Sequence, residues 1–212
     1  MTNDFSIVQC IYNRSHYPPE EMQKILQAAE EDESSAAKLL ADNAVDIAPY
    51  RTAVLKAMGD DFPREGVWYA KYVELFMNGL KEQLHTEAVV EDAPCTVQEE
   101  RPNYAASQRL TGDISIVAGL IAPESVYLRL AERYSEEEFS EVDEMAVDCI
   151  TELINVINGL LSVELGKEKI ETDLELPRHG QNVVPQGSRQ LCLRVHSAVG
   201  SFQIVMAESE FI

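Results

Sequence analysis

Residues 140–165 carry a long run of helical periodicity, and this segment constrains the fold more than any other. With successive residues placed about 100° apart, its apolar side chains gather on one arc. The arc comprises Met145, Cys149, Leu153, Val156 and Leu160, and it is extended by Ala146, Ile150, Ile157 and Leu161. A helix with so broad an apolar face must be covered by another element. We therefore expect a long helix that buries Cys149, Leu153, Val156 and Leu160 against a sheet.

Segments with strand character occur in two clusters, one before and one after this helix. The first cluster comprises residues 87–91, 95–98 and 112–121, and the second comprises 170–176, 191–197 and 201–207. Helical periodicity marks residues 68–84, a further helix opens at Pro123, and a Ser-x-x-Glu capping box at Ser135 precedes the long helix. Because helices and strands are grouped rather than alternating singly, we predict an α+β fold with helices packed on a mainly antiparallel sheet.

The first third of the chain is predicted to be helical. Pro18, Pro19 and two glutamates mark a helix start, apolar residues recur at helical spacing over 36–45, and a third set ends at Gly59. Residues 60–66 combine proline and glycine with charge, as linkers do. We predict a helical N-terminal segment at residues 1–62 and a main domain at 68–212. Because so short a segment has a marginal core, its helices should pack on the main domain or at a dimer interface.

The charge balance excludes several classes of partner. Thirty-seven acidic side chains against seventeen basic ones give a formal net charge of −20, which repels phosphate-rich surfaces. No run approaches the roughly 20 apolar residues of a membrane span, and the first residues lack the basic flank and apolar core of a signal peptide. We expect a cytoplasmic protein that binds neither nucleic acid nor a membrane.

The cysteines and histidines suggest no further site. Four widely spaced cysteines, Cys10, Cys95, Cys149 and Cys192, include no Cys-x-x-Cys pair, so zinc, iron–sulfur and thioredoxin-type sites lack their usual spacing. We expect buried thiols in a reducing compartment and no metal site. His179 and His196 are far apart in the sequence and have no obvious carboxylate partner.

Four residues line up along the outward side of the predicted long helix, opposite its apolar arc. Asp148, Glu152, Asn155 and Gly159 follow at intervals of four, three and four residues, within roughly 40° of one line. A glycine in the middle of a helix costs roughly 1 kcal/mol relative to alanine, so Gly159 suggests that another molecule approaches closely here. We expect Glu152 and Asn155 to be exposed. Asn158 points away from this line and is predicted to be a helix-surface residue.

Residues 148–159, Asp-Cys-Ile-Thr-Glu-Leu-Ile-Asn-Val-Ile-Asn-Gly, resemble the signature helix of the CheX branch of the CheC/CheX/FliY chemotaxis phosphatases. That signature is Glu-x-x-Asn followed by glycine four residues later. The glycine-bounded strand from Gly112, the helix from Pro123, and the terminal hairpin after Leu176 and Pro177 resemble the order of elements in the same family. The resemblance covers about residues 68–212 and implies a CheX-like fold.

The resemblance also implies an activity. A CheX-like chemotaxis phosphatase hydrolyses the aspartyl phosphate of a CheY-like response regulator. By resemblance, Asn155 holds the nucleophilic water, and Glu152 pairs with the active-site lysine of the receiver. Asp148 and Gly159 are candidate partner-binding residues, Asp148 at the rim and Gly159 where the receiver comes close. The protein would need no cofactor of its own, with Mg²⁺ expected on the partner receiver. The family further implies a homodimer.

Only one such site is expected, and two other interpretations stay open. The earlier helix repeats the Asn-Gly-Leu triplet at Asn78, but alignment on it places Tyr72 and Leu75 where Glu152 and Asn155 stand. The first alternative is a non-catalytic CheX-like adaptor that binds a receiver or another chemotaxis or flagellar protein. The second is a structural homologue with an unrelated ligand.

Overall fold

The structure of this 212-residue chain is a computed structural model. It describes residues 17–31, 49–58, 66–91, 93, 95, 101–185, 189–208 and 212. The chain divides into two compact units, of which the first is made of Met1–Pro94 and Leu193–Ser201 and the second of Cys95–Cys192 and Phe202–Ile212. The division between a segment at 1–62 and a domain at 68–212 stays a prediction.

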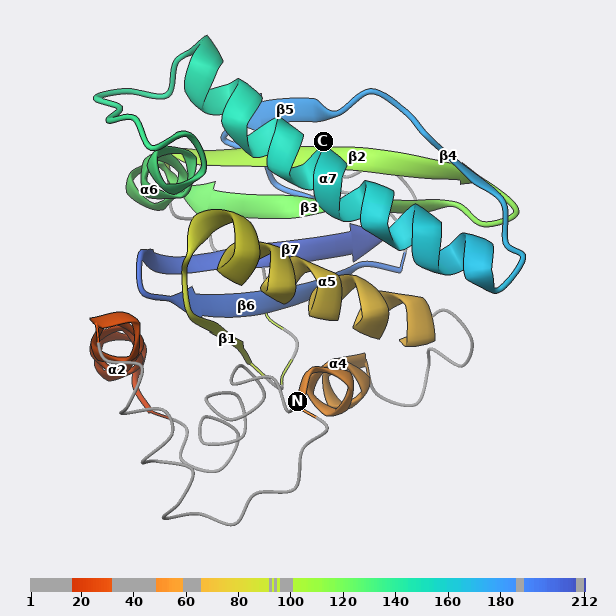
Figure 1. The fold of residues 1–212 in the computed structure, drawn as a ribbon, viewed down its shortest axis with the longest axis horizontal. Helices are drawn as coiled ribbons and strands as arrows, with labels where there is room; N and C mark the ends of the chain where they lie inside the picture. Colours follow the sequence, from red (N-terminus) through yellow and green to blue (C-terminus); the bar gives the residue numbers. More distant parts are fainter. Residues whose placement is uncertain are drawn as a thin grey trace. The chain divides into compact units, whose positions relative to one another are not determined.

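The first unit contains three described helices and a short strand pair (Figure 1). The helices are α2 (Pro19–Glu31), α4 (Pro49–Met58) and α5 (Gly66–Leu84). Strand β1 (Ala88–Val90) pairs antiparallel with β6 (Leu191–Ser197), and Val89 lies opposite His196 in the register. Helical periodicity predicted α2, α4 and α5 within a few residues, whereas residues 36–45 and the linker at 60–65 lie outside the described residues.

The N-terminal helices of this unit pack on elements that follow them in the chain. Met22 and Leu26 of α2 are fully buried in a cluster with Val89 of β1 and Ala198. The side-chain amides of Gln23 and Gln27 both donate to the carbonyl oxygen of Ala198, at 3.2 and 3.0 Å. Helix α4 packs on α5, where the side chain of Met58 lies beside Gly66. As expected for so short a segment, these helices share their core with later residues.

The second unit is a sheet covered by two helices. It contains β2 (Asn103–Gly112), β3 (Ile116–Pro123), α6 (Glu124–Ser135), α7 (Glu144–Lys167), β4 (Thr172–Leu174), β5 (Arg178–Gln181) and most of β7 (Gly200–Ala207). Strand β3 pairs with β7 on one side and β2 on the other, and β2 pairs in turn with β4 and β5, always antiparallel. Helix α7 crosses the face of β2, and α6 lies against one end of β3 (Figure 1). The predicted α+β fold with a mainly antiparallel sheet is confirmed.

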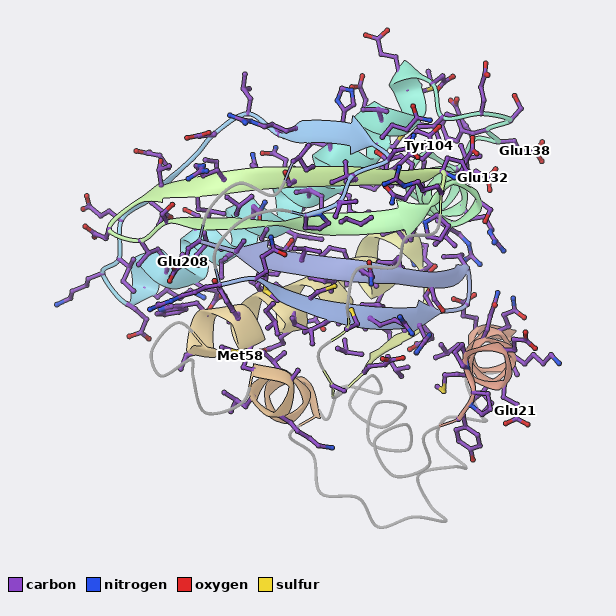
Figure 2. All side chains as sticks on the ribbon, turned by 180° about the vertical axis from the view of Figure 1, so that it is seen from behind. Glu21, Met58, Tyr104, Glu132, Glu138 and Glu208 are labelled. Carbon is purple, nitrogen blue, oxygen red and sulfur yellow. The ribbon has the colours of Figure 1, made fainter. Side chains whose placement is uncertain are left out.

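The tyrosines at one end of this sheet join it to α6. The ring of Tyr104 at the start of β2 packs on the ring of Tyr127, with centroids 5.5 Å apart. Tyr104, Glu132 and Glu138 are labelled toward the same end of this unit in Figure 2. Burial raises the pKa of Tyr127 well above its usual range, so the phenol stays neutral.

Strands β2 and β5 were not predicted from the sequence. The predicted strand at 112–121 is in fact the end of β2, a turn and most of β3. Gly112 ends β2 with a φ of +127°, and a Cβ there would lie 2.3 Å from the carbonyl oxygen of Glu171. Strand β2 escapes detection because polar residues, among them Ser107 and Gln108, occupy buried positions in it. Hydrophobic alternation cannot reveal a strand whose buried side chains are polar.

The long helix begins later than predicted. Ser135 is the last residue of α6, and its hydroxyl donates back to the carbonyl oxygen of Ala131. Asp143 is the N-cap of α7, and its Oδ1 accepts a hydrogen bond of 2.9 Å from the backbone N–H of Ala146. Such a cap stabilises a helix by about 1 kcal/mol. The Ser135–Glu138 motif is therefore not the start of α7.

The buried side of α7 is rotated from the predicted one. Leu153 is fully buried as expected, but Val156 is only half-buried, Leu160 is 45% exposed and Met145 is 52% exposed. The buried row instead follows the residues predicted to extend the arc, Ala146, Ile150, Ile157 and Leu161, together with Ile154. By length and composition alone α7 could span a membrane. Its packing on β2 accounts for the apolar content of the buried side.

Two substitutions on α7 test this rotation. Leu153→Ala should lower the free energy of unfolding by about 2–5 kcal/mol, because it removes fully buried methyl groups and leaves a cavity. Leu160→Ala should change it by less than about 1 kcal/mol, since that side chain is largely exposed. Denaturant unfolding of both variants provides the comparison, and equal destabilisation would contradict the buried face described for α7.

Candidate functional site

The four residues predicted to face outward on α7 differ in exposure. Asp148 and Glu152 are exposed, and Asn155 and Gly159 are half-buried. A Cβ built on Gly159 would meet nothing within 4 Å outside its own helix, so the space beside this residue is open. Asn155 is thus less exposed than predicted, and the cause is a side chain of the underlying strand.

Gln108 of β2 fixes the position of the Asn155 carboxamide. Gln108 is only 2% exposed, and its Nε2 donates to Oδ1 of Asn155 at 2.8 Å. The same nitrogen donates to the carbonyl oxygen of Glu175 at 2.8 Å, so both hydrogens of the Gln108 amide are used. The Nδ2 of Asn155 lies 3.4 Å from Oε2 of Glu152 and donates to it. The two motif residues therefore meet at the surface, and one of them is held from below.

Asn158 belongs to this arrangement and is not a surface residue as predicted. It is fully buried, and its Nδ2 donates to Oε1 of Gln108 at 3.1 Å. The Oδ1 of Asn158 is buried without a hydrogen-bond partner among the described residues. An isolated buried carbonyl costs on the order of 1–3 kcal/mol, so Asn158 is retained at some cost to stability. The functional signal that sequence reasoning missed is this pair of buried amides, Gln108 and Asn158.

The arrangement leaves the Asn155 amide able to bind a water molecule. A carboxamide nitrogen carries two hydrogens, and its oxygen has two lone pairs. Glu152 accepts one hydrogen of Asn155, and Gln108 donates to one lone pair, so one of each stays available. The orientation of the amide is set, because Gln108 donates and must face the oxygen. Asn155 can consequently donate to and accept from one water without itself titrating.

The surroundings of Glu152 are electrostatically negative and partly apolar. Burial, and then the charge of Glu152, raise the pKa of Tyr134 on α6 above its usual range. Burial also raises the pKa of the Cys149 thiol, to which the charge of Asp148 adds. Among the described residues, no three His, Cys, Asp or Glu side chains come together in a way that could hold a metal ion.

An apolar row lies along α7 beside the polar one. Met145, Val156 and Val163 fall within about 20° of one another around the helix axis, and Glu152 lies within about 40° of all three. Met145 and Val163 are exposed and Val156 is half-buried. Exposed apolar side chains gathered on one face, next to a fixed polar pair, are typical of a surface that another protein covers.

Helix α5 carries no equivalent polar pair at the aligned positions. Tyr72 is fully buried, which raises the pKa of its phenol far above the usual range, and Leu75 is half-buried. The neighbouring Glu74 is exposed and pairs with Lys71 on the same helix at 3.4 Å. The expectation of a single site stays a prediction.

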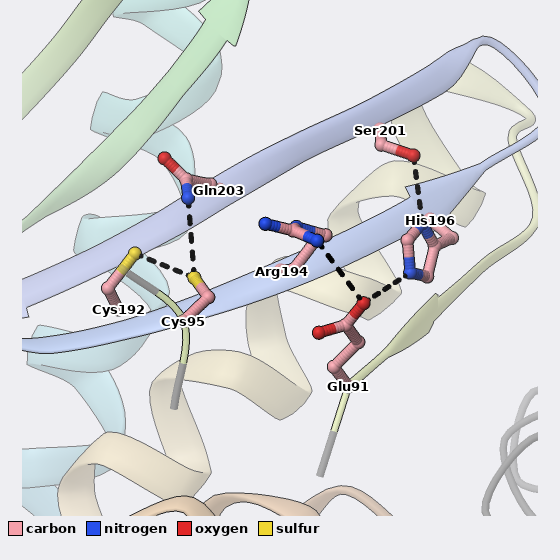
Figure 3. A network of polar contacts seen from close by, with 7 residues as sticks. All are labelled: Glu91, Cys95, Cys192, Arg194, His196, Ser201 and Gln203. Atoms are coloured by element: carbon pink, nitrogen blue, oxygen red, sulfur yellow. Dashed lines mark hydrogen bonds and ion pairs between the residues drawn. The ribbon is translucent and has the colours of Figure 1, made fainter. Parts of the chain in front are cut away.

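A second polar cluster in the first unit corrects the prediction for His196. Its Nε2 lies 2.8 Å from Oε1 of Glu91, and its Nδ1 lies 2.8 Å from the hydroxyl of Ser201 (Figure 3). Because a carboxylate can only accept, Nε2 carries a hydrogen and donates it to Glu91. Arg194 approaches the same carboxylate at 3.8 Å. His196 is 1% exposed, so this row of groups holds β1 to β6 from within the core.

Comparison with known proteins bears on the second unit and its site. Residues 104–196 match the family model described as "Chemotaxis phosphatase CheX". This stretch includes β2 with Gln108 and all of α7, the two elements that form the site. No curated protein sequence matches the chain.

Solved structures of CheX proteins share the fold. The chemotaxis protein CheX from Vibrio vulnificus superimposes with a TM-score of 0.59 at 14% identity, over 66% of this chain and 98% of that one. CheX from Desulfovibrio desulfuricans gives 0.58 at 11% identity, over 68% and 99%. CheX from Borrelia burgdorferi, solved as a CheX–CheY–BeF₃–Mg²⁺ complex, gives 0.54 at 18% identity, over 66% and 95%. Residues 104–196 are therefore similar in sequence to the CheX family, and the chain shares the fold of CheX proteins.

Proposed function

We propose that this protein is a phosphatase that hydrolyses the aspartyl phosphate of a CheY-like response regulator, with the outward side of α7 as its catalytic surface. The observation that supports this most directly is the Glu152–Asn155 pair on one helix, in which Glu152 is exposed and Asn155 is held by a buried glutamine of the sheet. A pair that only faced solvent would need no such support from the strand beneath it.

The reaction suits a surface that supplies few groups. In hydrolysis of an aspartyl phosphate, water attacks phosphorus, the bond from phosphorus to the carboxylate oxygen breaks, and inorganic phosphate and a free aspartate result. Such transfers are accelerated chiefly by positioning and by charge organisation. In this proposal Asn155 places the attacking water in line, because its amide can donate and accept at once. The Mg²⁺ and lysine of the reaction belong to the receiver.

The partner is proposed on the same surface. The relative from Borrelia burgdorferi was solved in complex with CheY, BeF₃ and Mg²⁺, and we extend this class of partner to the present chain. Glu152 is proposed to pair with the active-site lysine of the receiver. The apolar row at Met145, Val156 and Val163 provides contact area, and the open space at Gly159 admits receiver loops. Asp148 lies at the rim.

An adaptor that binds a receiver without turnover is the second candidate. Glu152 and the apolar row alone would suffice for docking, and only the fixed Asn155 amide argues for hydrolysis. The protein is further proposed to act in the cytoplasm, where its partner class resides. A homodimer stays a prediction.

Substitution of Asn155 separates the two candidates. Asn155→Asp keeps the acceptor for Gln108 but removes the donor, and Asn155→Ala removes both. Each should lower the rate of aspartyl-phosphate decay by about tenfold to a thousandfold while docking is largely retained. The measurement is loss of phosphate from the phosphorylated receiver, with binding of the beryllofluoride-loaded receiver titrated in parallel. Wild-type acceleration that survives in Asn155→Ala would remove catalysis from α7, and binding without any wild-type acceleration would establish the adaptor.

Glu152 should instead control docking. Glu152→Ala should weaken binding of the beryllofluoride-loaded receiver by about 1.5–3 kcal/mol, because a charge-assisted contact is lost. Being exposed, the residue should contribute little to stability. Glu164→Ala is the matched control, since Glu164 lies on the same helix and forms an ion pair with Lys167 one turn away. Equal loss of affinity in both variants would show that the effect is one of overall charge.

Gln108 should act through Asn155. Gln108→Leu keeps the approximate volume but removes the hydrogen bonds to Asn155 and Asn158, so the free energy of unfolding should fall by about 1–3 kcal/mol. Below the unfolding temperature, turnover at saturating receiver should also fall, with little change in binding. Arg109→Leu, the next residue on β2 and half-exposed, serves as the control. A variant of Gln108 that is destabilised but retains full turnover would restrict this residue to a structural role.

A further inference from the structure

Two cysteines of the second unit lie in direct contact outside the proposed site. The Sγ atoms of Cys95 and Cys192 are 2.9 Å apart (Figure 3). Their backbones are also joined, because the N–H of Cys95 donates to the carbonyl oxygen of Cys192 at 3.0 Å. The two residues are therefore neighbours through both their backbones and their side chains.

We propose that Cys95 and Cys192 form a reversible intramolecular disulfide on reaction with a low-molecular-weight disulfide such as oxidised glutathione. A disulfide joins sulfur atoms about 2.05 Å apart, so the thiols need to approach by only about 0.9 Å from their separation of 2.9 Å. Neither residue belongs to α7 or to the network around Gln108. This proposal is independent of the phosphatase assignment.

The two thiols have different parts in the reaction. Cys95 is half-buried and can meet a reagent, whereas Cys192 is only 7% exposed. The side-chain amide of Gln203 donates to Sγ of Cys95 at 3.3 Å (Figure 3). A hydrogen-bond donor directed at sulfur stabilises the thiolate, which is the reactive form. Cys95 is therefore the attacking residue, and Cys192 is the resolving one.

The electrons and atoms balance in two exchanges. The Cys95 thiolate attacks one sulfur of the reagent, forms a mixed disulfide and releases one thiolate of the reagent. Cys192 loses its proton to solvent and attacks Sγ of Cys95, which closes the protein disulfide and releases the second thiolate. The two protein thiols are oxidised by two electrons, and the reagent disulfide is reduced to two thiols. An excess of reduced reagent reverses both steps.

Cys149 provides an internal contrast. It is buried on α7, and burial raises the pKa of its thiol. A thiol that is both shielded and harder to ionise reacts slowly with disulfides. Cys149 is expected to stay reduced under conditions that oxidise the Cys95–Cys192 pair.

The disulfide would close a long loop within the second unit. Cys95 and Cys192 are 97 positions apart, and the chain between them forms β2, β3, α6 and α7. A cross-link over so long a loop restricts the unfolded chain strongly. Oxidation is therefore expected to raise the melting temperature of the full-length protein, and reduction should reverse the increase.

Alkylation and mass spectrometry of the full-length protein test the proposal. The chain has four cysteines. After incubation with oxidised glutathione and acid quenching, the intact mass should have fallen by about 2 Da from loss of two hydrogens. On subsequent alkylation, two of the four cysteines should be protected. Peptide mapping should place the link between Cys95 and Cys192. A link through Cys10 or Cys149, or no link at any ratio of oxidised to reduced glutathione, would overturn the proposal.

Three variants check the order of events. Cys192→Ser should stop at a glutathione adduct on Cys95, and Cys149→Ser should oxidise as the wild type does. Gln203→Leu should slow formation of the disulfide by about fivefold, the effect of losing one hydrogen bond. If Cys192→Ser still forms an internal disulfide, or if the adduct appears on another cysteine first, the assignment of Cys95 as the attacking thiol is wrong.

Discussion

A carboxamide buried in the middle of a β-sheet must have its hydrogen-bonding groups satisfied, and in this protein that requirement links the sheet to the surface of α7. Gln108 is 2% exposed, and its nitrogen donates to both Asn155 and the backbone of Glu175. Its oxygen accepts from Asn158. Rotating α7 by one residue, about 100°, would break both side-chain bonds and leave a buried polar group unpaired. The same contacts that satisfy the strand therefore fix the face that the helix presents outward.

The two sides of α7 consequently have different physical roles. Its apolar residues, with Leu153 fully buried among them, hold the helix on β2 by burial that has no directional preference. The amides of Asn155 and Asn158 fix the rotation of the helix about its axis, because hydrogen bonds require specific atoms at specific positions. Burial alone would permit several rotations of a helix with so broad an apolar face, and the polar contacts select one of them.

Helices and strands whose apolar residues follow a clear period could be predicted from the sequence, and those with polar residues at buried positions could not. Strand β6 and helix α5 were predicted nearly to their ends because their apolar residues alternate or recur with the expected period. Strand β2 was missed because its buried positions include Ser107 and Gln108. The outward row on α7 could be located, but Leu160 was assigned to the interior and Asn158 to the surface. Both errors arise because the rotation of α7 depends on the hydrogen bond between Asn158 and Gln108. Gln108 lies 50 positions away in the sequence, so no local pattern reveals this contact.

The contrast between Asn155 and Glu152 has a consequence for how such a surface can diversify. Asn155 is held by the sheet, so its orientation is decided when the domain folds. Glu152 is exposed, so its side chain is less restricted by the fold than that of Asn155. In the proposed phosphatase, substitutions around Glu152 would alter which receiver is preferred without moving the group that positions water. Substitutions beneath Asn155 would alter the chemistry for every receiver alike. In that proposal, receiver recognition and water positioning belong to side chains one helical turn apart and can change separately.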